Sequence, residues 1–362
     1  MTSLVLPSTR EEAWRWSDLS ALPALAGSGP TGQQADVASL WLDCGGPRLL
    51  FVDGVLDQGA SDPRGLATGK VEADAGGHPL GRLAEGDGWT LELGTGHAVP
   101  GLIEIIHVST GGANHGAARI ALAPDAQASV VESFVGDGWA NRLTDIRLAK
   151  GARLMRAVRL AQDSGFTSVR EQADLGEGAS LVTVLLGEGG AGTRIDGAIR
   201  IGGKGAYAEI GGALLARDEQ RHDVNVVVRH DARGCVSRQI WRSVADDRAI
   251  ASIAARVEVA RDAQKTDAEQ SLRGLLLKRS ATANLKPELE IFADDVKCAH
   301  GATVGELDRN ALFYLASRGV PPQEAQALLT RAFVADALAR IGEEKARETF
   351  SREAEEWLGG RA

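Results

Sequence analysis

Cys298 and His300 are the two side chains of this sequence whose type and spacing most directly suggest metal chemistry. Residues two apart on an extended strand point to the same face, with their Cα atoms about 6.6 Å apart. A thiolate and an imidazole placed in this way can both ligate one metal centre. Zinc sites and iron-sulfur clusters take three or four protein ligands, and no neighbouring residue supplies the others. The missing ligands would have to come from elsewhere in the fold or from another chain.

The remaining cysteines and histidines form no recognised metal-binding or disulfide pattern. Cys44 and Cys235 are widely separated in the chain, and an odd set of three cysteines favours a reducing compartment over a disulfide framework. Four histidines flank a strand-like run or a Gly-rich turn in two pairs: His107 with His115, and His222 with His230. We expect all four side chains at the surface, the alternative being a metal site.

Two Gly-rich segments, residues 187–192 and 202–205, resemble phosphate-binding loops only superficially. Neither continues into the Gly-Lys-Ser/Thr that opens the helix of a Walker sequence, and no dinucleotide fingerprint is present. Both fit tight turns between strands. We therefore expect no nucleotide on this chain, so that any ATP hydrolysis would take place on a partner.

The composition favours repetitive β-structure in a soluble protein. Of the 362 residues, 44% are hydrophobic but only 4% aromatic, and 44 are glycine, so the core must consist of small and aliphatic side chains around many turns. The net charge of -9 disfavours nucleic acid and anionic membranes as partners. The start lacks the pattern of a secretory signal, and no apolar run reaches about 18 residues. We expect a cytoplasmic location.

A repeat of about 27 residues runs through the middle of the chain. At each step a small residue follows Gly or Asp between two strand-like runs: Asp125-Ala126, Gly151-Ala152, Gly178-Ala179, Gly205-Ala206, Gly234-Cys235 and Asp262-Ala263. Gly and Asp tolerate the left-handed backbone of a corner, and the small residue fits inside the bend. Repeats of this length are too short for crossover helices, so they predict a parallel β-solenoid of some seven or eight coils, roughly 35 Å long.

The distribution of proline supports a continuous strand ladder. No proline lies between Pro124 and Pro287, and proline would remove hydrogen bonds from central strands. We place the next corner at Lys297-Cys298, after an irregular stretch at residues 271–287. In that position Cys298 is either a metal ligand or, like Cys235, a small apolar residue that fills a corner.

The predicted fold is mainly β, with a parallel β-helix core flanked by N-terminal and C-terminal helical regions. Residues 1–90 form a helical and mixed region with a helix at about residues 11–24, residues 91–303 form the β-helix, and residues 304–362 form a helical domain. Three helices are expected after Gly305, the first ending at Gly319. Because a solenoid exposes unpaired strand edges at its ends, these helices would cap the last coil or dock a partner.

Two motifs resemble the SufB/SufD family. VKCAHGATVGELD (residues 296–308), with its continuation RNALFYLASRG, closely resembles the C-terminal signature of the SufD members. REEAWRWSDL (residues 10–19) is similar to the amphipathic N-terminal motif of SufB and SufD proteins. Members of this family are subunits of the SufBCD complex, which assembles iron-sulfur clusters, and the region between the two motifs matches mainly by pattern.

The resemblance implies a non-enzymatic scaffold subunit that pairs with a SufB-like paralogue and docks a SufC-like ATPase through its C-terminal helices. It gives His300 the role of a ligand, and Cys298 an accessory role, for a nascent iron-sulfur cluster that is transient and shared with the paralogue. The alternative is that both residues only pack against the terminal helices. The resemblance also links reduced flavin to the assembled complex, and the exposed last coil suggests a homodimer when the paralogue is absent.

The competing hypothesis is a β-solenoid carbohydrate-active enzyme, for example one that acts on acidic polysaccharide. Such an enzyme needs carboxylates or basic residues clustered along one exposed sheet and a cleft rich in aromatic side chains. Aromatic residues are sparse in this chain. A hexapeptide acyltransferase is a third possibility, but the six-residue period that defines it is absent.

Overall fold

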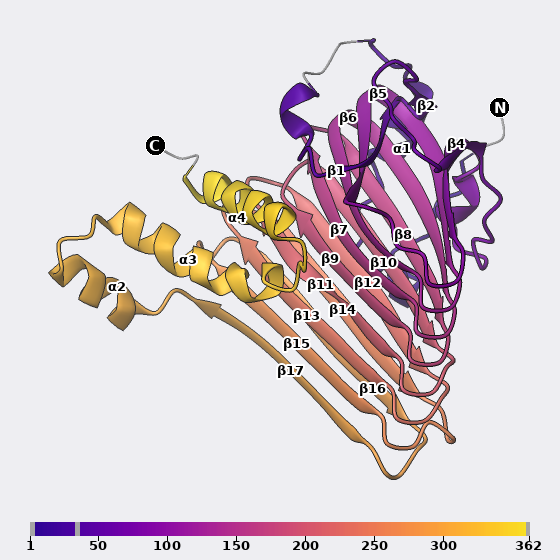
Figure 1. Cartoon of the computed structure of the whole chain (residues 1–362). Coiled ribbons are helices and arrows are strands. Elements are labelled where there is room, and N and C mark those ends of the chain that lie inside the picture. Colours follow the sequence, from indigo (N-terminus) through magenta and orange to yellow (C-terminus); the bar gives the residue numbers. More distant parts are fainter. Residues whose placement is uncertain (1–3, 33–36, 360–362) are drawn as a thin grey trace.

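The structure, a computed structural model, describes residues 4–32 and 37–359. Its centre is the predicted parallel β-helix of about eight coils, in which each coil contributes one strand to each of two facing ladders (Figure 1). Ladder A contains β1 (Gly45–Val52), the first halves of β5 (Leu102–Leu122) and β6 (Gln127–Leu148), β7 (Arg153–Gln162), β9 (Ser180–Gly187), β11 (Tyr207–Ala216), β13 (Val236–Ala245), β15 (Asp267–Leu276) and β17 (Lys297–Glu306). Ladder B contains β4 (Asp87–Leu93), the second halves of β5 and β6, β8 (Phe166–Leu175), β10 (Gly192–Ile201), β12 (Arg221–His230), β14 (Ile250–Val259) and β16 (Thr282–Ile291).

Alternation along each strand separates the interior of the solenoid, which we call the lumen, from its outer faces. In β12 the side chains of Val224, Val226 and Val228 are fully buried in the main core, whereas Arg229, which follows Val228, is exposed. Successive side chains of a strand point to opposite sides. Since parallel strands pair in register, each inward side chain lies over its equivalent in the neighbouring coil and forms a column along the lumen.

The first five predicted corners are confirmed. Their first residues all have a left-handed backbone, with φ between 60° and 71°: Asp125, Gly151, Gly178, Gly205 and Gly234. The following alanine or cysteine is fully buried in every case. The corner therefore works as the sequence suggested, because Gly and Asp accept the positive φ and only a small side chain fits inside the bend.

The sixth predicted corner is displaced. The left-handed residue there is Lys265, with φ 63°, and the buried residue that follows it is Thr266 rather than Ala263. The amide of Asp267 donates to the carbonyl of Cys235, which makes Thr266 the equivalent of Cys235. This corner, at residues 260–266, is longer than the corner at residues 231–235, so the sequence period shifts although the ladder continues.

Residues 271–287 are regular, and this corrects the placement of Cys298. They comprise the second half of β15, a short turn at residues 277–281 and the first half of β16, and β17 follows in register, with Cys298 opposite Ala268. Cys298 therefore lies within the last strand of ladder A and not at a corner. Pro287 is accommodated because β16 is an edge strand that pairs only with β14.

The N-terminal region does not contain the predicted helix at residues 11–24. It forms a 3-10 turn, η1 (Glu12–Trp14), and a separate short helix, α1 (Leu22–Gly27). Between them the Asp18 carboxylate accepts hydrogen bonds from the amide and hydroxyl of Ser20, a local turn that competes with helix. The rest of the region supplies η2 (Ala38–Leu40), η3 (Gly81–Leu83) and the short strands β2 (Val55–Leu56) and β3 (Ala67–Lys70), which pair antiparallel with β1 and β4.

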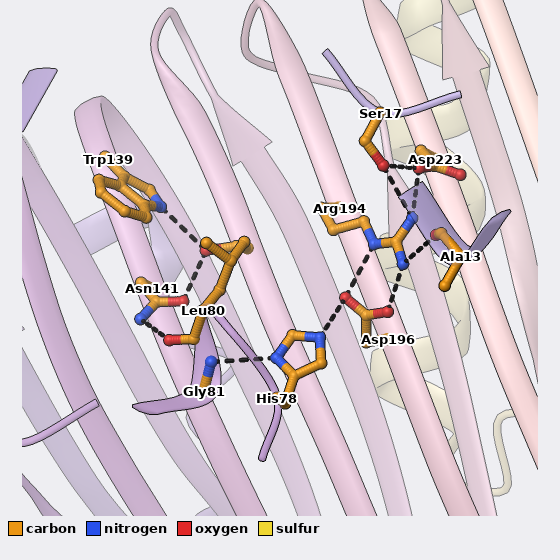
Figure 2. A network of polar contacts seen from close by, with 11 residues as sticks. Ala13, Ser17, His78, Leu80, Gly81, Trp139, Asn141, Arg194, Asp196 and Asp223 are labelled. Atoms are coloured by element: carbon orange, nitrogen blue, oxygen red, sulfur yellow. Dashed lines mark hydrogen bonds and ion pairs between the residues drawn. The ribbon is translucent and has the colours of Figure 1, made fainter. Parts of the chain in front are cut away.

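The N-terminal motif is held on the outer face of ladder B by a buried cation (Figure 2). Arg194 on β10 donates to Asp196 at 2.6 and 2.8 Å, to Asp223 at 2.5 Å, and to the Ser17 hydroxyl and the Ala13 carbonyl at 2.9 Å each. Burial opposes the charge of this guanidinium, but the two carboxylates outweigh burial and raise its pKa. The Trp14 ring lies 4.2 Å from the guanidinium carbon.

A second part of the same network ties in the loop that leads to η3 (Figure 2). His78 lies 3.1 Å from Asp196 through Nε2 and accepts the amide of Gly81 at Nδ1. Asn141 on β6 donates to the carbonyl of Leu80. The N-terminal motif of this chain therefore binds the chain's own solenoid.

The three predicted C-terminal helices are present as α2 (Arg309–Ser317), α3 (Pro322–Leu338) and α4 (Glu344–Gly359). They do not cap the last coil, which corrects that expectation. The outer face of ladder A is apolar at Val184, Ala213 and Val244, and α3 and α4 cover it with Leu338 and Phe350 (Figure 1). Burying this apolar surface explains why the helices lie along the side of the solenoid.

The predicted division of the chain at residues 90 and 303 stays a prediction. β4 begins at Asp87 and β17 runs to Glu306, so the strand ladders extend slightly past both positions. Within the described residues, no helix combines the length and the apolar character needed to cross a bilayer.

Replacing Arg194 with methionine should lower the free energy of unfolding by about 3–5 kcal/mol, because Asp196 and Asp223 would remain buried without their cation. Urea denaturation measures the change. Arg200→Met is the matched control on the same strand; its side chain is 58% exposed, and the loss should be about 1 kcal/mol or less. Equal losses in the two variants would contradict the role given to Arg194.

Candidate functional site

The solenoid is open at the end formed by its last coil. β17 pairs only with β15, and β16 pairs only with β14, so in the described part of the chain no strand covers their outer edges. Ile291, Phe292 and Val304 are 38%, 60% and 47% exposed at this end. Figure 1 shows β16 and β17 as the uncovered border of the molecule. Unpaired backbone groups and exposed apolar side chains therefore occur together at this end of the solenoid.

The side chains of Cys298 and His300 are both on the lumen side of β17. Cys298 is opposite Ala268 and His300 is opposite Gln270, and both partners are almost completely buried inward residues of β15. Cys298 is half-buried and packs beside Ala268 and Val257, whereas His300 is exposed. The expectation that the two side chains share one face is therefore met, and this face is the mouth of the lumen.

The two candidate ligands differ in how readily they can bind a metal. Burial raises the pKa of the Cys298 thiol above its ordinary value of 9.0. The thiolate, which is the form that binds metal, is therefore disfavoured at neutral pH until a cation approaches. His300 offers an exposed imidazole. Of the two side chains, the imidazole is the more accessible to a metal ion.

The chain does not complete a metal site by itself within the described residues. No three histidine, cysteine, aspartate or glutamate side chains there are grouped closely enough to hold a metal ion. Cys44 and Cys235 lie elsewhere, and the Cys235 thiol donates to the carbonyl of Gly203 inside its corner. Cys235 is thus the small filler that the sequence predicted.

The lumen beneath His300 is polar. Gln270 and Gln239 occupy the same inward column in the two coils below it and are 1% and 0% exposed. The Nε2 of Gln239 donates to the carbonyl of Arg256 at 3.0 Å. Within the described residues, Gln239 Oε1 and both amide atoms of Gln270 have no hydrogen-bond partner. The last coils therefore contain buried amide groups at inward positions that aliphatic side chains could also fill.

Three of the histidines expected at the surface are buried in the lumen instead. His222 and His230 are 1% and 0% exposed at the two ends of β12, and burial lowers the pKa of each to about 4. His107 is 3% exposed in the first half of β5. The predicted Gly-rich turn is present after it as an irregularity at Gly111 and Gly112, both with positive φ, where β5 passes from ladder A to ladder B. Residues an even number apart on one strand share a face, so both ends of β12 point inward.

A charged cluster inside the first coils was not foreseen from the sequence. Arg156 pairs with Glu132 at 2.6 Å and with Glu171, and Glu132 also accepts from His107 at 2.8 Å. Burial would raise the pKa of Glu132, but the hydrogen bond from His107 and the charge of Arg156 lower it to about 2. Arg142 adds a second buried cation beside His107. The charges of these groups balance, which fits a structural role in the ordering of the coils.

The C-terminal helices form an arm anchored to ladder A by ion pairs. Asp336 on α3 binds Arg242 of β13 at 2.5 Å, and Arg340, which follows α3, binds Glu209 of β11 at 2.6 Å. At the far end of the arm, Phe313 and Tyr314 on α2 are 76% and 57% exposed. Figure 1 shows α2 extending beyond the solenoid at the level of its last strands. The arm therefore presents aromatic side chains to solvent beside the open coil.

Comparison with known proteins gives consistent matches over most of the chain. Residues 105–333 match the sequence model described as "SUF system FeS cluster assembly, SufBD core domain". The iron-sulfur cluster assembly protein SufD of Escherichia coli K12 is 30% identical over 371 aligned residues, which cover 94% of this chain and 86% of the E. coli protein. An iron-sulfur cluster assembly SufBD family protein of Mycobacterium tuberculosis is 27% identical over 365 residues, covering 96% and 88%. A chloroplastic protein of Arabidopsis thaliana is 30% identical over 60% of this chain and 48% of its own length.

Cys298 should react slowly with iodoacetamide at pH 7.5, and the midpoint of its rate against pH should lie above 9, because burial raises the pKa of this thiol. Mass spectrometry of peptides gives its rate separately from those of Cys44 and Cys235 in one sample. Cys235, which is fully buried, is the internal control and should react only when the protein unfolds. A midpoint below pH 8 at Cys298 would show that the thiol is not held protonated by its surroundings.

Proposed function

Because the chain belongs to the SufBD family of SUF iron-sulfur cluster assembly proteins, we propose that it is a SufD-like, non-enzymatic scaffold subunit of that machinery. The observation that carries the proposal is the open last coil, where His300 and Cys298 face the mouth of the lumen and the described residues supply no third ligand. Two ligands at an unpaired edge suit a site that a second subunit completes. The cluster is the cargo of this site and is transient.

The partner at this edge is a SufB-like paralogue in our proposal. The free edges of β16 and β17 offer backbone donors and acceptors for strand pairing, and Phe292 and Val304 offer apolar surface beside them. A paralogue with the same kind of last coil can extend both ladders and add its own ligands to His300. Without the paralogue, a second copy of this chain can occupy the edge, which gives a homodimer.

The helical arm is the docking site for a SufC-like ATPase in the same proposal. Phe313 and Tyr314 are exposed aromatic side chains of the kind that dominate protein interfaces. The ion pairs of Asp336 with β13 and of Arg340 with β11 connect the arm to strands close to the last coil. Movement of a bound ATPase would then reach the edge of the solenoid through α3. Nucleotide would bind the ATPase, and reduced flavin would serve the assembled complex.

A cytoplasmic location completes the proposal. The described cysteines are all unpaired, and the chain is acidic, with a net charge of -9. Free thiols suit a reducing compartment, and a negative surface does not favour nucleic acid or anionic membranes as partners.

The covered faces of the solenoid and the hollow along its corners do not fit the competing carbohydrate-active enzyme. The outer face of ladder A is covered by α3 and α4, and part of the outer face of ladder B is covered by the N-terminal motif. A hollow of about 930 Å³ runs along the corners that join the ladders, but none of the described residues that line it is aromatic. Stacking of a sugar ring, which such enzymes use, has no support there.

Replacing His300 with alanine should reduce the iron bound after anaerobic reconstitution at least about tenfold in a complex of this chain with its SufB-like and SufC-like partners. Visible absorption and iron content measure the cluster, and size-exclusion chromatography shows whether the complex is intact. Cys298→Ala should cause a smaller loss, because this thiol is half-buried and protonated.

Thr303→Ala is the matched control for these variants, since Thr303 is an exposed residue of the same strand that points away from the lumen. It should load as the unaltered chain does. Full cluster loading in the His300→Ala complex would remove the proposed ligand role.

Replacing Phe313 or Tyr314 with alanine should weaken binding of a SufC-like ATPase by about 2 kcal/mol, or roughly 30-fold in Kd, if each is an anchor of the interface. Isothermal titration calorimetry measures the affinity. Val55→Ala, which alters a residue 64% exposed on β2 at the other end of the molecule, should leave it unchanged. An unchanged Kd in both aromatic variants would place the ATPase elsewhere.

A further inference from the structure

We propose that Gln270 is a positioning residue for His300: its side-chain carbonyl accepts the imidazole N–H and so determines which ring nitrogen is free to bind the cluster. The inference rests on the proposed function, since it adds a second component to the same site. It concerns a residue that carries no recognisable motif and that only the strand register brings to His300.

The register places the two side chains at the same level on neighbouring strands. His300 is opposite Gln270 in β15, and Gln270 is opposite Gln239 in β13, so the three residues form one inward column. Neighbouring strands lie about 4.8 Å apart, a separation that glutamine and histidine side chains can bridge by hydrogen bonding along the column. His300 is the outermost member and Gln239 the innermost.

Gln270 needs partners that this column can supply. Its side chain is 1% exposed, and neither Nε2 nor Oε1 has a hydrogen-bond partner among the described residues. Leaving a buried polar atom unpaired costs about 1–3 kcal/mol. The polar side chains directly above and below it in the column are His300 and Gln239, and a hydrogen bond to each would satisfy both ends of the amide.

The hydrogen bond of Gln239 determines the donor-to-acceptor direction of the hydrogen bonds along the column. Gln239 donates through Nε2 to the backbone carbonyl of Arg256 at 3.0 Å, and a carbonyl can only accept. Gln239 Oε1 is therefore the free end of that amide, and it suits the Nε2 of Gln270. The Oε1 of Gln270 is then directed toward His300 and can only accept. The column thus offers an acceptor, and not a donor, to the imidazole.

This polarity selects one form of the ring. A neutral imidazole has one N–H and one nitrogen with a lone pair. If the N–H is given to Gln270, the other nitrogen faces the mouth of the lumen with its lone pair available, as in metal sites where a hydrogen bond orients the ligating histidine. Cys298 stands over Ala268, which offers no such bond. The difference agrees with the accessory role given to the thiol.

The tautomer of His300 tests the inference in the isolated full-length chain. Ring nitrogen shifts, from long-range proton-nitrogen spectra of histidine-labelled protein, should show one dominant tautomer of the His300 ring at pH 8. Gln270→Met should change the tautomer ratio at least about threefold, because the acceptor is lost. Gln270→Glu keeps an acceptor oxygen and should retain the original tautomer.

Two further variants distinguish a specific change in the tautomer ratio from an effect of unfolding. Gln239→Met should shift the ratio in the same direction, because it releases the orientation of Gln270. Thr303→Ala should leave the ratio unchanged. An identical ratio in the unaltered chain and in folded Gln270→Met would overturn the inference, as would an identical ratio in Gln239→Met if the first variant does not fold.

The experiment separates this inference from the proposed function. A tautomer shift in Gln270→Met together with normal cluster loading in His300→Ala would support the hydrogen bond and reject the ligand role. An unchanged tautomer with loss of the cluster in His300→Ala would support the ligand role and reject Gln270 as its positioning residue.

Discussion

In-register pairing of parallel strands is the constraint on which this structure depends. It makes every inward residue stand over its equivalent in the next coil, so the interior is a set of columns and not a freely packed core. Length can then vary only at corners, as it does at residues 260–266, where the ladder continues undisturbed. The same pairing decides what the last coil presents. The column that is aliphatic at Val130 continues through Arg156 of the charged cluster and Thr183, and it contains Gln239 and Gln270 before it ends in His300.

Other elements of the chain cover much of the rest of the solenoid, and the last coil is left as its open end. α3 and α4 cover the outer face of ladder A, and the N-terminal motif is bound to ladder B through Arg194. At the first coil, β2 and β3 pair with β1 and β4. At these places apolar side chains are buried and strand edges are paired. The candidate site at β16 and β17 therefore depends on what the rest of the chain covers as well as on its own residues.

Local chemistry explains what could be predicted from the sequence. The corners were found because Gly and Asp at positive φ and a small buried residue leave a short signature, and the C-terminal helices were found from their stop at Gly319 and start at Pro322. The sixth corner was misplaced because extra residues in one corner shift the period. His222 and His230 were predicted at the surface because they are polar. Their even spacing from Val224, Val226 and Val228 on the same strand places them on the inward face. Gln270 gives no local signal, since its importance arises only from the residue that the register places above it.

The anchoring of the N-terminal motif also orders events during synthesis. Ser17 and its partner Asp223 are 206 residues apart, so the motif cannot bind until most of the solenoid has left the ribosome. At about 5–20 residues per second, that interval lasts roughly 10 to 40 seconds. Until Arg194 and Asp223 have been made, the cluster of Trp14, Leu22 and Trp139 lacks the ion pairs that fix the motif to the solenoid. The nascent chain therefore passes through a long period before this anchor can form, and its apolar surface is incompletely covered during that time.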